Sequence, residues 1–433
     1  MIRSAARSLG AYTMDRRPLA VAAYRRLWVA SAVCAVGGSF SVVAVPAQLF
    51  TVTGSSAAVG GAGAVSFVAL VVAALWIGAL ADVMDRRRVL LAAHSGLALT
   101  YAGLWIHTVL GGRSVAVLMM LVACQGLTFG AIMTTMGAVV PRLVPVELLP
   151  AANSLMSLTR YAGSILGPVL AGVVIPAVGL GTLYLCDAVA LLAVVWAVVR
   201  LPPLPPLPHP AGPSHDPDAQ WRTRRPTIGQ VVASFRYVAA SRLLVAVLAV
   251  DLAAMVFGMP IALFPELAQH TYGGSAGGGL ELGLLYAAYP AGVVTAGLLS
   301  GTFTRVRRHG ALMAAAAAAW GVTVVVLGLA AQLWVALATL VIGGAVNFVL
   351  STFRNAITQA HTHDAMRGRI QGSLTVVLFG GPHIANLLHG AAASILDPRM
   401  VICAGGLLTT VTVAAIAWAV PELRNYTPRH HDL

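Results

Sequence analysis

Long apolar segments, interrupted by short polar loops, extend over almost the whole chain of 433 residues. A helix needs about 20 apolar residues to cross the hydrocarbon core of a bilayer. Twelve segments meet this length, so we predict an all-α polytopic membrane protein with twelve transmembrane helices. The predicted cores are residues 27–50, 57–81, 88–110, 115–140, 154–177, 181–200, 243–268, 280–303, 309–330, 333–355, 371–395 and 399–420.

Positive charge is concentrated in alternate loops. The chain has no lysine, and its 27 basic residues are arginines that lie almost entirely on one side of the ladder of apolar segments. Only Arg113 and Arg399 fall in loops that would face the other way. Cytoplasmic loops of membrane proteins are enriched in Arg and Lys. The pattern therefore predicts a cytoplasmic N-terminal segment over residues 1–26 and a cytoplasmic tail over residues 421–433.

A proline-rich stretch divides the twelve segments into two sets of six. It begins LPPLPPLPHP at residue 201, and proline at this density favours an extended linker over a globular domain. Apolar residues recur at helical spacing from 228 to 238, which predicts a short amphipathic helix on the inner leaflet. We expect an N-terminal half over 27–200, a linker with this helix over 201–242, and a C-terminal half over 243–420. Internal repeats of this kind are typical of secondary transporters.

Composition argues against several other classes of protein. Charged residues make up only 9% of the chain and hydrophobic residues 58%, whereas soluble domains are roughly a quarter charged. The net charge of +13 comes from arginines that punctuate apolar runs, which does not favour a nucleic-acid partner. The four cysteines lie singly in apolar segments, so neither disulfides nor a metal site are indicated. Without a lysine there is no P-loop, no nucleophile–base set indicates an enzyme, and we expect no cofactor.

The loop between the second and third predicted helices carries the first motif. It reads GALADVMDRRR and contains Gly78, Asp82, Arg86 and Arg87. Gly78 would let neighbouring helices approach closely, and Asp82 would hold an arginine or a helix N-terminus. The loop resembles the signature G-x-x-x-D-R-x-G-R-R of the major facilitator superfamily, although Val83 and Asp85 replace its arginine and glycine. The resemblance implies a latch between the two halves in one state of a transport cycle.

Two other segments bear on the direction and coupling of transport. Gly167 and Pro168 lie in GSILGPVLAG, which resembles the fifth helix of exporters of the superfamily and implies a role in transport or gating. Close packing of small residues is the alternative reading. Many proton-coupled drug exporters carry R-x-x-Q-G in the fourth helix, whereas this chain has Val122 before Gln125 and Gly126. Their coupling mechanism therefore cannot be transferred to this chain.

Longer segments resemble the enterobactin-exporter branch of the superfamily. They are PAQLFTVTGSSAAVG, GALADVMDRRRVLL, LPAANSLMSLTRYAGSILGP, ALFPELA, GLLYAAYPAG and MRGRIQGS. The resemblance implies a monomeric, multi-pass transporter of the bacterial inner membrane, which exports a siderophore by proton-coupled alternating access. Its partners would be the small molecule, protons and the lipid bilayer. Efflux of drugs or of a self-made antibiotic is the alternative function. A non-transporting sensor is disfavoured, because no sizeable soluble domain could carry a signal.

Polar and ionisable residues inside the predicted helices are candidates for proton coupling or for lining a cavity. A charge at mid-membrane costs at least about 2.5–3.5 kcal/mol, so such groups usually face a cavity or a partner. The candidates are Asp251, Glu266, Asp187, Arg160, Asn347 and His383. Polar residues also recur every four positions along the tenth predicted helix, where they could line a pore or pair between helices: Asn347, Ser351, Asn355 and Gln359. Asp251 ranks first because it lies in an otherwise apolar segment, where a carboxyl group can exchange protons near neutral pH. The alternative for Asp251 and Glu266 is a local pair, while Arg160 and Arg354 are as well explained as structural charges.

Overall fold

The computed structural model describes residues 15–81, 84–205, 236, 239–303, 306, 308–361 and 380–427. These residues form helices and no strand. The longer helices are α2 (Ala22–Gly37), α3 (Ser41–Thr53), α4 (Ser56–Ala81), α5 (Arg86–Val109), α6 (Val115–Leu143), α7 (Leu149–Val199), α10 (Arg242–Gly258), α12 (Leu280–Leu298), α13 (His309–Leu329), α14 (Leu333–Ala360) and α16 (Pro398–Ala419). Shorter elements are α11 (Phe264–Glu266), α17 (Pro421–Arg424) and the turns Arg17–Ala20, Val146–Leu148, Ile261–Leu263, Leu267–Thr271 and Ser300–Thr302. Residues 380–393 are also helical.

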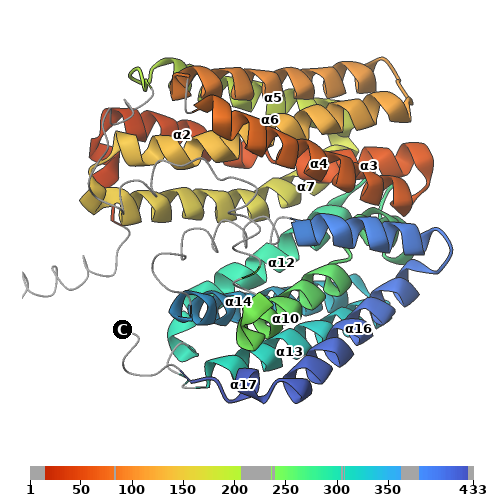
Figure 1. Cartoon of the computed structure of the whole chain (residues 1–433). Helices are drawn as coiled ribbons and strands as arrows, with labels where there is room; N and C mark the ends of the chain where they lie inside the picture. Colours follow the sequence, from red (N-terminus) through yellow and green to blue (C-terminus); the bar gives the residue numbers. More distant parts are fainter. Residues whose placement is uncertain are drawn as a thin grey trace, which may run out of the picture.

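The helices form two bundles that lie side by side. Helices α2 to α7 make the upper bundle of Figure 1, and α10 to α17 make the lower one. We call them the first and second halves. The end of the molecule with Arg86, Arg142 and Arg200 is called the proximal end, and the opposite end, with Gly54 and Gly111, is called the distal end. The bounds that the sequence predicts for the two halves, residues 27–200 and 243–420, stay a prediction.

The protein is an all-helical, multi-pass membrane protein. Within the described ranges, nine helical stretches are long and apolar enough to cross a membrane. One of them, Val146–Val199, is two helices, because Gly179 leaves the helical region with φ 74° and ψ 168°. Helix α12 and the helix of residues 380–393 are not counted among these nine stretches. The number twelve itself stays a prediction, because residues 362–379 lie outside the described ranges.

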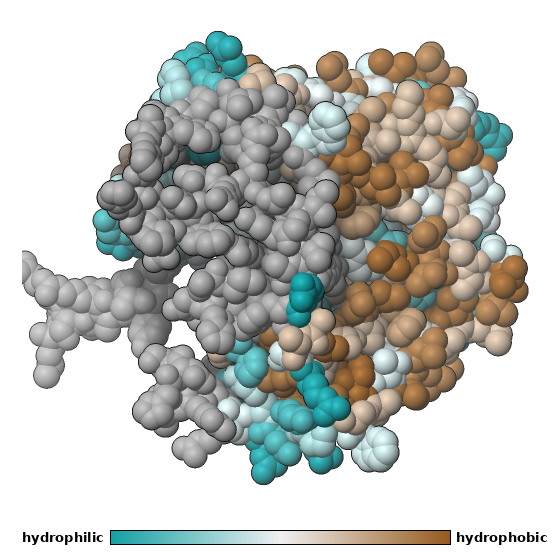
Figure 2. Space-filling model, viewed as in Figure 1, coloured by the Kyte–Doolittle hydropathy of each residue, from teal (hydrophilic) through white to brown (hydrophobic). Residues whose placement is uncertain are grey.

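Apolar side chains cover much of the outer surface. Leu99 is 72% exposed, Val411 64% and Trp418 81%. Figure 2 shows apolar residues over a large part of one face, with hydrophilic residues gathered near its edges. A soluble monomer rarely exposes so large an apolar patch, whereas lipid chains solvate such a surface at no cost.

The first and seventh predicted helices are each interrupted, although each was predicted as one span. The predicted span 27–50 consists of α2 and α3, which are separated around Gly38. The predicted span 243–268 consists of α10, a break at Met259 and Pro260, and the elements from Ile261 onward. Pro260 has no backbone N–H to continue the helix. Broken helices are tolerated in membranes where neighbouring groups satisfy the freed backbone.

Glycines bring the two halves into contact at two crossings. A Cβ added to Gly283 of α12 would lie 2.3 Å from the carbonyl oxygen of Pro168 in α7. A Cβ added to Gly60 of α4 would lie 2.2 Å from the carbonyl oxygen of Asn386. Only glycine permits backbones to approach this closely. At both crossings, the second helix of one half meets the fifth helix of the other half. The contact between the halves therefore has approximate twofold symmetry.

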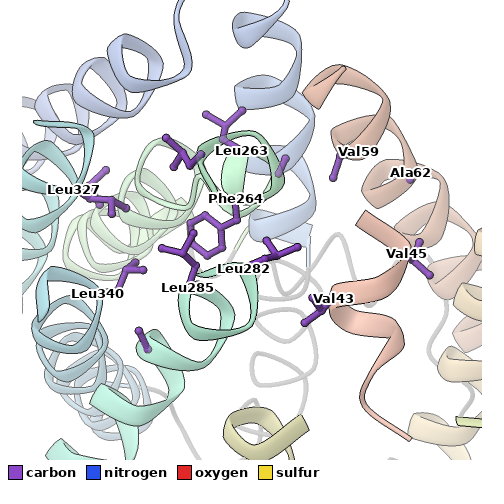
Figure 3. Packing of buried hydrophobic residues seen from close by; sticks show 14 of the residues in the cluster. Val43, Val45, Val59, Ala62, Leu263, Phe264, Leu282, Leu285, Leu327 and Leu340 are labelled. Carbon is purple, nitrogen blue, oxygen red and sulfur yellow. The ribbon is translucent and has the colours of Figure 1, made fainter. Parts of the chain in front are cut away.

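One hydrophobic cluster extends across both halves. It contains Val43 and Val59 of the first half together with Phe264 and Leu285 of the second. Figure 3 shows Phe264 packed among leucines of the second half, with the valines of α3 and α4 on the facing elements. A separate cluster at the proximal end belongs to the first half alone, and includes Leu204 from the start of the linker. Packing across the halves is therefore concentrated away from the proximal end.

The described part of the linker is short. Leu201 and Leu204 are buried, and the Leu204 N–H donates to the Asp85 carboxylate at 3.1 Å. Most of the predicted linker over 201–242 lies outside the described residues, as do residues 228–235, 237 and 238 of the predicted amphipathic helix.

Candidate functional site

A cavity of about 610 Å³ lies between the halves, in the middle and proximal parts of three helices. Its lining comprises Tyr161 and Ser164 from α7, Tyr289, Pro290 and Val293 from α12, and Asn347, Phe348, Ser351, Thr352, Arg354 and Asn355 from α14. Apolar and aromatic walls with a few polar groups are typical of small-molecule sites, which usually measure 300–1,000 Å³. The cavity is therefore large enough for a small-molecule substrate.

A polar stripe on α14 supplies much of this lining. Asn347, Ser351 and Asn355 are spaced four residues apart, so they share one face of the helix. The sequence left two alternatives for them, lining a pore or pairing between helices. The structure combines the two for Asn347, because this residue lines the cavity while its amide oxygen accepts a hydrogen bond of 2.9 Å from the Tyr289 hydroxyl of α12.

Asp251 and Arg354 form an ion pair in the wall of the cavity. One guanidinium nitrogen, Nη1, donates to the two carboxylate oxygens at 2.8 and 2.9 Å. Both residues are buried, and Arg354 lines the cavity while Asp251 lies behind it. A buried pair of this kind needs good geometry, because removing two charges from water is expensive. Asp251 is thus locally paired, with its partner between it and the cavity.

Asp187 holds the break in the first predicted helix. Its two oxygens accept the backbone N–H groups of Phe40 at 3.2 Å and Ser41 at 2.7 Å, and it also accepts the Ser41 hydroxyl. The first N–H groups of α3 would otherwise lack partners inside an apolar bundle. Asp187 is fully buried and has no cationic partner among the described residues. It therefore acts as an N-cap supplied by a helix distant in sequence.

Glu266 belongs to the contact between the halves at the distal end. Its carboxylate accepts a hydrogen bond of 2.5 Å from the hydroxyl of Ser56, at the start of α4. One turn further, the His270 ring meets the Phe50 ring edge-on, with centroids 5.8 Å apart. His270 lies in the segment Leu267–Thr271, which is π-helical, a geometry often found at functional sites. These side-chain contacts, together with the glycine crossings, define the distal contact.

The remaining predicted residues lie outside the cavity. Arg160 is exposed and stacks on its neighbour Tyr161 at 5.6 Å, so its position fits a structural charge. His383 stacks on Phe67 of the first half, with ring centroids 5.1 Å apart. A Cβ added to Gly167 would meet Ser39 at 2.6 Å, beside the break between α2 and α3.

The structure describes the signature loop only in part. Gly78 lies in the last turn of α4, and Asp82 lies outside the described residues. Arg86 donates to the carbonyl oxygen of Ala138 at 3.3 Å, and Arg87 donates to that of Val199. Arg87 thus satisfies a free carbonyl group at the C-terminal end of α7, while Arg86 contacts a carbonyl group near the end of α6. The loop thus fastens helix ends within the first half.

Three residues that contribute to the signature loop or to the cavity were not predicted from the sequence. Asp85 was treated only as a departure from the signature, but its side chain accepts the N–H of Arg87 at 2.9 Å and caps α5. An aspartate just before a helical segment is a cap signal that could have identified it. Tyr161 and Tyr289 line the cavity, and no sequence signal separates them from other membrane tyrosines.

In the described ranges, no group of three His, Cys, Asp or Glu is placed to hold a metal ion.

Comparison with known proteins gives consistent results. The family described as transmembrane secretion effectors, of the major facilitator type, matches residues 14–431. The chain is 26% identical to the enterobactin exporter EntS of Citrobacter koseri over 404 residues, or 93% of each chain. The EntS proteins of Shigella boydii and Escherichia coli match at the same identity and coverage.

Solved structures of transporters share the fold. The nucleoside transporter NupG superposes with a TM-score of 0.66 at 12% identity, covering 94% of this chain and all of the other. A bacterial homologue of the iron transporter ferroportin, in its inward-facing state, superposes with a TM-score of 0.64 at 15% identity, covering 91% and 98%. Identities this low show the common fold alone.

Proposed function

Because the chain belongs to the transmembrane secretion effector family of the major facilitator superfamily, we propose that it exports a small, siderophore-like molecule by alternating access. The observation that carries this proposal is the similarity to enterobactin exporters over 93% of the chain. The cavity between the halves supports it, because a site lined by both halves can face either side of a membrane in turn. The protein would work as a monomer, because residues of a single chain line the cavity.

The proposed driving force is proton entry, with Asp251 as the first candidate for the coupling carboxylate. Proton uptake by Asp251 would remove its charge attraction to Arg354, which lines the cavity. Proton binding would thereby change what the guanidinium contacts at the substrate site. Glu266 is the next candidate because it joins the halves, and Asp187 follows because it holds the break before α3. The latch implied by Gly78 and Asp82 remains part of this proposal.

Export is expected to be visible in iron-limited cells. Deleting the gene in its own host should lower the secreted siderophore severalfold and raise the amount inside the cell, because synthesis continues without an exit. Chromatography of medium and cell extracts measures both pools, and the wild-type gene on a plasmid serves as the control. Unchanged secretion, together with new sensitivity to unrelated drugs, would instead assign the protein to multidrug or antibiotic efflux.

Orientation in the membrane is a second expected result. The proximal end carries the arginine excess, so it should face the cytoplasm. In intact cells, a membrane-impermeant maleimide should label Ser275→Cys in the distal loop, and it should label Ser214→Cys in the linker only after lysis. Both variants should be built on a chain that lacks the four native cysteines. Labelling of Ser214→Cys alone in intact cells would reverse the proposed orientation.

A further inference from the structure

A histidine outside the cavity faces two carbonyl oxygens at the break in the seventh predicted helix. His389 lies in the helix of residues 380–393 and is buried. Its Nδ1 atom lies 2.8 Å from the carbonyl oxygen of Ala385, one turn earlier in the same helix. Its Nε2 atom lies 3.1 Å from the carbonyl oxygen of Phe257, in the last turn of α10. A carbonyl oxygen only accepts hydrogen bonds, so each ring nitrogen is placed to donate one.

A neutral histidine ring cannot make both of these bonds, because it carries one N–H and one lone pair. The lone pair would face a carbonyl oxygen at hydrogen-bond distance, and two acceptors repel each other. A ring with a proton on both nitrogens satisfies both carbonyl groups. Its positive charge would lie at the C-terminal end of α10, where the helix dipole stabilises a cation. The geometry around His389 therefore fits the charged form of the ring.

The break explains why the Phe257 carbonyl is free to accept from His389. In a continuous helix its partner would be the N–H of Ile261, but α10 ends at Gly258 and a separate turn begins at Ile261. Gly405 of α16 leaves room for the bond, since a Cβ added there would lie 2.9 Å from the His389 Nε2 and 2.3 Å from the Phe257 oxygen. A buried carbonyl without a donor is costly, so the bond to His389 stabilises the break.

The charge on His389 has no carboxylate to balance it in the part of the chain that the structure describes. Helix α4, which meets the neighbouring Gly390, has no ionisable side chain, and Arg242 lies at the other end of α10. The other ionisable groups on α10, α16, the segment after the break and the helix of residues 380–393 have partners or ring neighbours of their own: Asp251, Arg399, Cys403, Glu266, His270 and His383. The two carbonyl oxygens are therefore what stabilises the charge.

We propose that His389 is a proton-binding site that controls the break between α10 and the segment after it. With both nitrogens protonated, the ring fastens the end of α10 to the helix of residues 380–393. In that helix, Gly390 packs on the carbonyl oxygen of Ser56, whose hydroxyl donates to Glu266 beyond the break. Loss of either proton leaves a lone pair against a carbonyl oxygen, so the ring turns away, the end of α10 is freed and the distal contact is weakened.

The protonation of His389 can be observed in the purified full chain without any cargo. Nitrogen-15 NMR of protein labelled at histidine, after subtraction of the spectrum of a His389→Gln variant, isolates this ring. It should show two N–H nitrogens at about pH 5 and one unprotonated nitrogen at about pH 8, the range in which histidine changes its charge. A ring that stays neutral, or stays charged, over the whole range would overturn the proposal.

Exposure of the distal contact tests the conformational consequence. Val59 is buried in the cluster that both halves share, so Val59→Cys in a chain without the native cysteines should react with a maleimide only when the contact opens. Its labelling rate is divided by the rate in a His389→Gln background at the same pH. This ratio removes the intrinsic pH dependence of the thiol and the titration of Glu266 and His270, which both proteins share.

The ratio should be about tenfold lower at pH 5 than at pH 8, because tenfold corresponds to about one good hydrogen bond. His389→Lys keeps a charge and donors at either pH, so labelling in it should stay slow at both. His94→Gln is the matched control, since the His94 Nδ1 makes the same contact within its helix, 2.9 Å from the Leu90 carbonyl oxygen, and the pH profile should not change. A ratio that is independent of pH would overturn the proposal.

The consequence for transport rests on the proposed function, whereas the proton site does not. If the NMR and labelling tests fail while iron-limited cells still depend on the gene for secretion, the proposed function stands and only the role of His389 is lost.

Discussion

A disulfide that joins α4 to the helix of residues 380–393 is expected to stop transport. A Cβ added to Gly63 would lie 3.6 Å from the Asn386 Cβ, which is the separation that a disulfide needs. The bond would tie the first half to the second near the distal contact. Alternating access requires this contact to open, so Gly63→Cys with Asn386→Cys should lose at least about nine-tenths of its activity on oxidation, and reductant should restore it.

A second disulfide serves as the matched control. A Cβ added to Gly181 would lie 3.9 Å from the Thr108 Cβ, and both residues belong to the first half near the distal end. Thr108→Cys with Gly181→Cys should therefore cross-link equally well without slowing transport. Both pairs should be built without the native cysteines, and mass spectrometry should confirm each bond. Full activity of the oxidised Gly63 and Asn386 pair would show that this part of the distal contact stays closed throughout the cycle.

Removing one member of the Asp251–Arg354 pair should have the second large effect. Arg354→Gln leaves a buried carboxylate without its cation, and Asp251→Asn leaves a buried guanidinium without its anion. Loss of one partner of a buried pair typically costs about 3–5 kcal/mol of folding free energy. The double variant should recover much of the stability, because it leaves no unpaired charge. Thermal unfolding of the four purified proteins measures this coupling.

Transport assays distinguish the proposed role of the Asp251–Arg354 pair in coupling from its role in stability. In proteoliposomes, Asp251→Asn should abolish efflux driven by a pH gradient, and the double variant should also lack it despite its recovered stability. The exposed pair of Asp15 and Arg17 is the control, since Asp15→Asn should change neither stability nor transport measurably. A double variant that still concentrates substrate against its gradient would exclude Asp251 as the coupling carboxylate, and Glu266→Gln would then be examined.

Much of the architecture could be predicted from the sequence, because it depends on local composition. The apolar segments of about 20 residues set the helical class, since only a helix satisfies its own backbone in lipid. The proline-rich stretch that begins at residue 201 predicts a division into two halves, and its exact position stays a prediction. Helical periodicity predicts a polar stripe of Asn347, Ser351, Asn355 and Gln359, and the first three of these lie in the lining of the cavity.

Residue pairing depended on the tertiary structure. Asp251 and Arg354 are 103 positions apart, and Asp187 and Ser41 are 146 apart. An amphipathic helix reveals its buried face by its polar residues, but a helix that is apolar all round does not. Helix α10 is of this second kind, so the sequence could not show which way Asp251 points. For the same reason, Asp187 could not be identified as the cap of α3.

The sequence by itself thus determined that the chain forms apolar helices in two halves, with arginines gathered at one end, because lipid solvation and helical hydrogen bonding act within each segment. The interruption at Gly38, the cavity, and the closed distal contact were decided only by the tertiary structure. Each of these needs a group from a distant helix, and that group is close only after the helices have packed.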